Sequence, residues 1–157
     1  MEKLPPSSTS LILFLAFALF IIPFIFYLIT LQNILKVISP ENRKMAPSQV
    51  WLLLIPLFGL VWHFIVVSRI SDSIKNESLL RNNELKDSRP GYSTGLTMCV
   101  LICISIFPKV FGILSSVAFI AFIICWIIYW SKIVSYKRQI INSSIIKLDA
   151  ETYSIAD

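Results

Sequence analysis

The chain consists of four long apolar stretches separated by polar segments. A helix crosses the hydrocarbon core of a bilayer with about 20 predominantly apolar residues, and it satisfies its own backbone hydrogen bonds there. The four stretches reach or approach this length, and none of them contains an acidic residue. The pattern therefore predicts an all-α fold, an integral membrane four-helix bundle in a single domain over residues 1–157. The predicted spans are residues 11–30, 50–69, 92–107 and 110–131, followed by a polar C-terminal tail, residues 132–157.

Only Pro108 and Lys109 separate the third span from the fourth. Because proline interrupts a helix, we expect helices 3 and 4 to form a tight hairpin. The alternative is one kinked helix over residues 92–130, which would leave three spans in the chain. A helix of ~39 residues would be about twice as long as one crossing requires.

The polar segment after the second span keeps a helical pattern. Val66, Val67, Ile70 and Ile74 share one helical face, and the charged residues lie elsewhere on the helix. The pattern predicts an amphipathic cytoplasmic extension of helix 2 that ends before the turn residues 89–91. Such a helix can lie on the bilayer, pack against the chain's own tail or offer a face to a partner, and the pattern leaves these alternatives open.

The segment between the first two spans contains two prolines at candidate helix starts. The first helix is expected to continue to about Ile38, and Ser39 then precedes Pro40 as a candidate N-cap. Pro47 is expected to open the second span in the same way. The residues between the two prolines predict either a short interfacial helix or a connector that stays in water.

The composition agrees with a membrane location. Hydrophobic residues make up 56% of the 157 residues and charged residues 15%, with a mean hydropathy of +0.77. A soluble domain carries about 25% charged residues. The first apolar stretch is too long for the core of a signal peptide, and no small-residue cleavage site follows it. We therefore expect a multi-pass protein surrounded by the lipid bilayer.

Lysine and arginine residues indicate the orientation. With four spans, ten of them fall on the side that holds both termini and the middle polar segment, and four fall on the opposite side. The positive-inside rule then places both termini and the middle polar segment in the cytoplasm. These cytoplasmic lysine and arginine residues lie against anionic lipid headgroups and account for most of the net charge of +5. The charge therefore does not indicate nucleic-acid binding.

His63 is the only histidine of the chain, and it lies inside the second predicted span. An ionisable residue within a span is a functional candidate, and the alternative is a neutral imidazole that is hydrogen-bonded within the protein. Its candidate partners are the Thr97 hydroxyl and a backbone carbonyl freed by Pro56. Gly59, four residues earlier on the same face, would let a neighbouring helix approach closely. These residues predict a polar intramembrane contact or a pocket.

Cys99 and Cys125 lie at about the same predicted depth as His63, so we include them in this candidate pocket. Imidazole and thiolate ligands suit soft transition metals. However, the three residues form no ligand-spaced motif, and thiols in lipid resist ionisation. We therefore predict no metal and no cofactor.

Small residues on the fourth span predict a helix-packing face. Gly112, Ser115, Ser116 and Ala118 offer small positions about one turn apart, which allow close helix contact in lipid. Packing against the third span is the first interpretation, and contact with another molecule is the second.

Three motifs, "SPENRKM", "QVWLLLIPLF" and "RPGY", lie within residues 31–130. This part of the chain resembles a family of small uncharacterised bacterial inner-membrane proteins with four predicted transmembrane helices. The resemblance implies a four-helix membrane fold and a bacterial source. It implies no activity, cofactor or catalytic residue.

The sequence contains no Ser–His–acid set, no paired carboxylates, no HExxH motif and no glycine-rich phosphate loop. We therefore predict a non-enzymatic integral membrane subunit or scaffold that assembles with itself or with another membrane protein complex. The alternative is a carrier or sensor of a small molecule or lipid, with a pocket between helices 2, 3 and 4 near His63.

Overall fold

The computed structural model describes residues 6–81 and 87–156, and over this part of the chain it contains helices and no strand. The all-α prediction is therefore confirmed. The elements in chain order are α1 (Pro6–Val37), the 3₁₀ helices η1 (Pro40–Asn42) and η2 (Pro47–Leu54), α2 (Phe58–Leu80), α3 (Tyr92–Ser105), α4 (Pro108–Phe111) and α5 (Ile113–Ala156).

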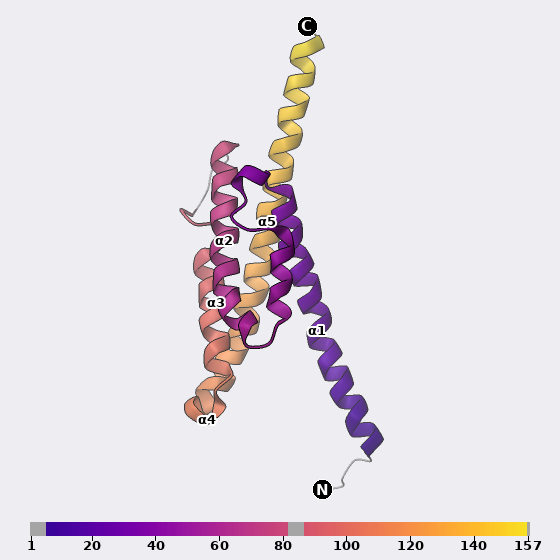
Figure 1. The fold of residues 1–157 in the computed structure, drawn as a ribbon, viewed down its shortest axis with the longest axis vertical. Coiled ribbons are helices and arrows are strands. Elements are labelled where there is room, and N and C mark those ends of the chain that lie inside the picture. The colour runs from indigo at the N-terminus through magenta and orange to yellow at the C-terminus, as the bar shows by residue number, and fades with distance from the viewer. Residues whose placement is uncertain (1–5, 82–86, 157) are drawn as a thin grey trace.

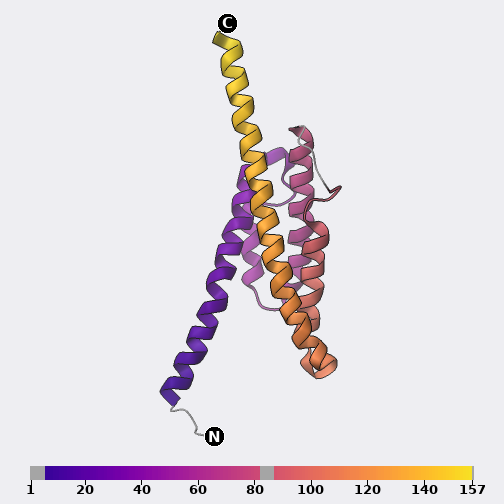
Figure 2. The same cartoon turned by 180° about the vertical axis from the view of Figure 1, so that it is seen from behind.

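Two helices meet the length and hydropathy that a membrane crossing requires. They are Ser10–Val37 in α1 and Ile113–Ile146 in α5, and α3 is a shorter apolar helix. Figures 1 and 2 show α1 and α5 running in the same direction and diverging at one end, where α1 begins and α4 lies. At the other end, α5 extends beyond the rest of the molecule.

Helices α3 and α5 form an antiparallel hairpin with the single turn of α4 at its tip (Figure 1). Pro108 is the first residue of α4, where its missing N–H costs nothing. Gly112 follows with φ of +53°, in the region that glycine adopts most easily. The predicted hairpin is therefore confirmed, and the alternative of a single kinked helix is wrong.

The second predicted span is wrong as a single helix. Pro47 opens a helix as expected, but this helix is η2, and the chain then reverses before α2 begins. At the reversal, the Phe58 N–H donates to the Pro56 carbonyl at 2.6 Å, and Leu57 between them has φ of +61°. This geometry is a classic γ-turn, which is strained for a residue with a side chain. Hydropathy could not reveal the turn because both arms are equally apolar.

The two arms of this reversal, η2 and the start of α2, pack against each other, and η2 also packs against α1. Gly59 makes the approach possible, because a Cβ atom there would lie 2.4 Å from the Leu53 carbonyl oxygen. The expectation that Gly59 admits a close neighbour is confirmed, although the neighbour belongs to the same segment. The η2–α2 reversal brings the chain back to the end of the molecule from which η2 started (Figure 1).

The core lies where α1, α2, α3 and α5 meet. Tyr27, Leu31 and Ile34 of α1 are fully buried, as are Met98 of α3 and Ile133 of α5. From α2, the predicted apolar face is buried as one row of side chains: Val66, Val67, Ile70 and Ile74. The predicted helical extension to Leu80 is therefore confirmed, and its apolar face packs within the chain.

Candidate functional site

His63 and Tyr27 form a buried polar contact between α2 and α1. The Tyr27 hydroxyl lies 2.9 Å from His63 Nε2, and the two ring centroids are 5.9 Å apart. His63 is 8% exposed and Tyr27 is fully buried. The contact satisfies two polar groups that would otherwise be costly in an apolar interior.

A hydroxyl group bonds to His63, as one interpretation expected, but it belongs to Tyr27 and not to Thr97. The Thr97 hydroxyl donates to the Ser93 carbonyl at 3.0 Å, one turn earlier in its own helix, and Thr97 is exposed. A threonine in a helix often bonds this way. The signal for the true partner was a tyrosine within the first span, but sequence spacing did not indicate which helix faces His63.

An apolar cavity of about 370 Å³ adjoins His63. Side chains from α1, the η2–α2 reversal, α2, α3 and α5 line it, and only His63 and the indole N–H of Trp126 supply polar side-chain groups among them. Four aromatic residues form part of its wall: Phe20, Phe24, Phe122 and Trp126. The remaining wall is aliphatic apart from Gly59: Leu53, Ile55, Pro56, Leu57, Leu60, Ile102 and Ile106. The structure thus places Gly59 and His63 together at a pocket, as expected.

Cys99 and Cys125 do not line this cavity. Cys99 is fully buried in the core, and Cys125 is partly buried on α5. Within residues 6–81 and 87–156, no group of three or more His, Cys, Asp or Glu side chains is arranged to hold a metal ion. The two cysteines are therefore packing residues and not part of the pocket.

The small residues of the fourth predicted span divide into two pairs. Ser115 and Ala118 are buried, and the Ser115 hydroxyl donates to the Ile104 carbonyl of α3 at 3.3 Å. Gly112 and Ser116 are exposed. Half of the predicted packing face therefore serves the α3–α5 hairpin, as the first interpretation states.

At the end of the molecule where α1 and α2 end and α3 begins (Figure 1), which we call the polar end, lies a buried carboxylate that the sequence pattern did not reveal. The side chain of Glu77 on α2 is fully buried and pairs with Arg81 at 2.6 Å. Its oxygens also accept hydrogen bonds from the Ser39 backbone N–H at 3.1 Å, the Ser39 hydroxyl at 3.0 Å and the Asn42 side-chain amide at 2.7 Å. Ser39 occupies the N-cap position of η1 before Pro40, as expected, but its hydroxyl bonds to Glu77 and forms no cap hydrogen bond.

This carboxylate links three parts of the chain. Arg81 donates to the Ile140 carbonyl at 3.4 Å and to the Ser144 hydroxyl, so the Glu77 cluster reaches α5 as well as the α1–η1 connection. Burial alone would raise the pKa of Glu77. The hydrogen bonds from Asn42, Arg81 and Ser39 outweigh burial and hold the pKa below its ordinary value. Glu77 is thus an anion that anchors the polar end of the bundle.

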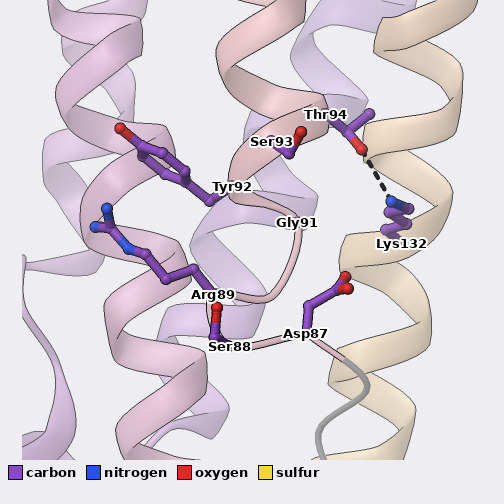
Figure 3. A pocket seen from close by; sticks show the side chains of 8 residues that line it. All are labelled: Asp87, Ser88, Arg89, Gly91, Tyr92, Ser93, Thr94 and Lys132. Carbon is purple, nitrogen blue, oxygen red and sulfur yellow. Dashed lines mark hydrogen bonds between the residues drawn. The ribbon is translucent and has the colours of Figure 1, made fainter.

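A second cavity, of about 430 Å³, lies where the segment before α3 meets α5 (Figure 3). Arg89 and Lys132, its two basic side chains, already have partners. Arg89 bonds to Asp72 at 2.8 Å and stacks over the Tyr92 ring at 4.0 Å, and Lys132 donates to the Thr94 hydroxyl at 2.9 Å. The hydrogen bond with Asp72 raises the pKa of Arg89. We interpret this cavity as a gap at the junction of α3 and α5.

No family model, curated protein or solved structure matches the chain. The resemblance to small bacterial inner-membrane proteins therefore stays a prediction. The candidate site rests on the geometry of the His63 cavity and of the Glu77 cluster.

Proposed function

We propose that this protein is a non-enzymatic, multi-pass subunit or scaffold of the bacterial inner membrane that assembles with itself or with another membrane protein. The observation that carries the proposal is the apolar surface that its long helices leave uncovered. Only 12% of the most apolar window of α1 is buried, and 28% of that of α5. A helix in the core of a soluble protein would be mostly buried, so these surfaces favour lipid or a protein partner as the neighbour.

The charges support one orientation in the membrane. Every lysine and arginine whose side chain the structure describes belongs to the segments gathered at the polar end, except Lys109 in α4 at the opposite end (Figure 1). By the positive-inside rule, the polar end faces the cytoplasm. Lys3 and Lys86 lie outside the described residues and do not enter this argument.

This orientation revises the arrangement of the termini that was expected from four alternating spans. Because α1 and α5 run in the same direction, we place the start of α1 on the outer side and the C-terminus in the cytoplasm. The η2–α2 reversal then enters the membrane from the cytoplasmic side and returns to it. Irregular backbone is tolerated at membrane depth where protein covers it. Val50 and Leu53 of η2 are buried against the rest of the chain, whereas residues 54–58 at the turn are exposed, so a partner would have to cover the turn.

The divergence of α1 from α5 supports assembly with a partner. Near its start, α1 exposes large apolar side chains in successive turns, among them Leu13, Phe14, Phe17 and Leu19. In Figures 1 and 2 this part of α1 stands apart from the bundle. A helix that stands apart from the bundle packs only against lipid, whereas a partner helix beside it would add close packing between helices.

Native mass spectrometry after gentle extraction tests the proposal. We expect a species heavier than the 17.9 kDa chain, which dissociates into several chains on activation. The variant Phe17→Ala with Leu19→Ala should weaken it, and Ile113→Ala, a matched change at an exposed residue of α5, should not. A monomer alone in every gentle detergent would contradict the proposal.

The second candidate function, a carrier or sensor of a small molecule or lipid, is favoured by the cavity beside His63. Flux of a candidate ligand into protein-containing vesicles tests transport. Flux that is absent in the wild-type protein, or that is unchanged by His63→Ala, would argue against a carrier.

A further inference from the structure

The cavity beside His63 has the composition of a site for a ligand and not only of a packing gap. Its volume of about 370 Å³ falls within the range of small-molecule sites, about 300–1,000 Å³. Such sites combine apolar and aromatic walls with a few placed polar groups. Here the aromatic wall comes from α1 and α5, the aliphatic wall from α3 and the η2–α2 reversal, and the polar groups are the His63 imidazole and the Trp126 indole N–H.

His63 has one ring nitrogen left for a ligand. Tyr27 occupies Nε2, and Nδ1 has no hydrogen bond within the part of the chain that the structure describes. If the Tyr27 hydroxyl donates to Nε2, then Nδ1 carries the proton and donates to a carbonyl oxygen. In the other tautomer, Nε2 donates to Tyr27, and Nδ1 accepts from a hydroxyl group.

The ligand must be neutral. No lysine, arginine, aspartate or glutamate lines the cavity, and an isolated charge in an apolar site is strongly disfavoured. The flat aromatic rings of Phe24, Phe122 and Trp126 favour a planar ring in the ligand, because offset and edge-to-face ring contacts add to apolar burial.

We propose that this cavity binds a neutral, lipid-soluble molecule of the quinone class, a planar ring bearing carbonyl or hydroxyl groups with an apolar tail. The ring lies against the aromatic wall, one oxygen bonds to Nδ1 of His63, and the tail leaves the cavity past its exposed lining residues Phe20, Leu57 and Ile106. The proposal rests on the second candidate function and names its ligand class. It requires no reaction, because the ligand is bound and not transformed.

The single histidine of the chain makes a direct test possible. Protein labelled with nitrogen-15 in histidine and embedded in phosphatidylcholine nanodiscs gives the NMR signals of one imidazole. We expect a decyl-substituted benzoquinone to shift the Nδ1 signal in a saturable way and to shift Nε2 less. The ionised fatty acid of similar length should produce no saturable shift.

Two adjacent residues of α2 provide the matched variants. Leu60 lines the cavity, and Val61 is exposed and does not line it. Leu60→Trp should fill the cavity and abolish the saturable shift, and Val61→Trp should retain it. If Leu60→Trp does not fold, as judged by circular dichroism and gel filtration, Ile106→Trp at the rim of the same cavity replaces it.

Several results would overturn the proposal. These are a shift that rises linearly with the probe, as for partition into lipid, an equal shift with the fatty acid, and an equal shift in the cavity-filling variant. A saturable shift without vesicle flux would retain the site and exclude a carrier. The mass of the native assembly is measured separately, so the failure of this site and the failure of the subunit proposal are distinguishable.

Discussion

Replacement of the Glu77 carboxylate by an amide tests whether the buried cluster at the polar end holds the bundle together. In Glu77→Gln the side chain keeps its size but loses its charge, and its new NH₂ group faces N–H donors of Asn42 and Arg81. The matched control is Asp72→Asn on the same helix. Asp72 also pairs with an arginine, Arg89, but both side chains of that pair are 39% exposed.

The two pairs differ in burial, and burial sets the expected magnitude. Removal of one partner from a buried ion pair costs about 3–5 kcal/mol, because the remaining charge is left without compensation. The Glu77 side chain is fully buried, but Arg81 is 18% exposed and regains some hydration. We therefore expect Glu77→Gln to lose about 2–3 kcal/mol of stability. Exposed pairs contribute about 0–1 kcal/mol, so Asp72→Asn should lose less than about 1 kcal/mol.

The free energies of unfolding can be compared by titration with a denaturing detergent in mixed micelles, with the loss of ellipticity as the readout. Limited proteolysis between α1 and α2 gives a second readout, because Glu77 holds the connection between them through Ser39 and Asn42. Equal losses for the two variants, or a loss below about 1 kcal/mol for Glu77→Gln, would refute the reasoning that burial makes this carboxylate the anchor.

Three further predictions follow from single residues. Because the folded-state pKa of Glu77 is lowered, its contribution is present above its ordinary pKa of about 4.5 and is lost as the pH falls through the folded value; a pH series of unfolding should show this acid loss in the wild type and not in Glu77→Gln. Tyr27→Phe should lose about 1–2 kcal/mol because it leaves His63 Nε2 without its partner; Tyr129→Phe is the control, since the buried Tyr129 hydroxyl has no hydrogen-bond partner among the described residues, and an equal loss would contradict the assignment. Leu57→Gly should be more stable than Leu57→Ala by about 1–2 kcal/mol, because glycine relieves the positive φ; thermal unfolding that ranks alanine above glycine would show that the γ-turn is not strained.

Local patterns determined the elements of this protein. The apolar stretches predicted where helices form, Pro108 predicted the break between α3 and α5, and the apolar face from Val66 to Ile74 predicted the extension of α2. Each of these features depends on residues close together in the chain. Backbone hydrogen bonding, proline geometry and the helical repeat act over that range, so sequence alone was sufficient.

The tertiary structure decided how these elements meet. Tyr27 bonds to His63 across 36 residues, and Ser39 bonds to Glu77 across 38, and neither pairing has a signal in spacing or composition. The reversal at Leu57 separates two apolar arms, so hydropathy read them as one crossing and predicted that α1 and α5 run in opposite directions, whereas they run in the same direction (Figures 1 and 2). Hydropathy reports that a segment avoids water, but not which way it runs or which helix it faces, because packing between distant side chains sets both.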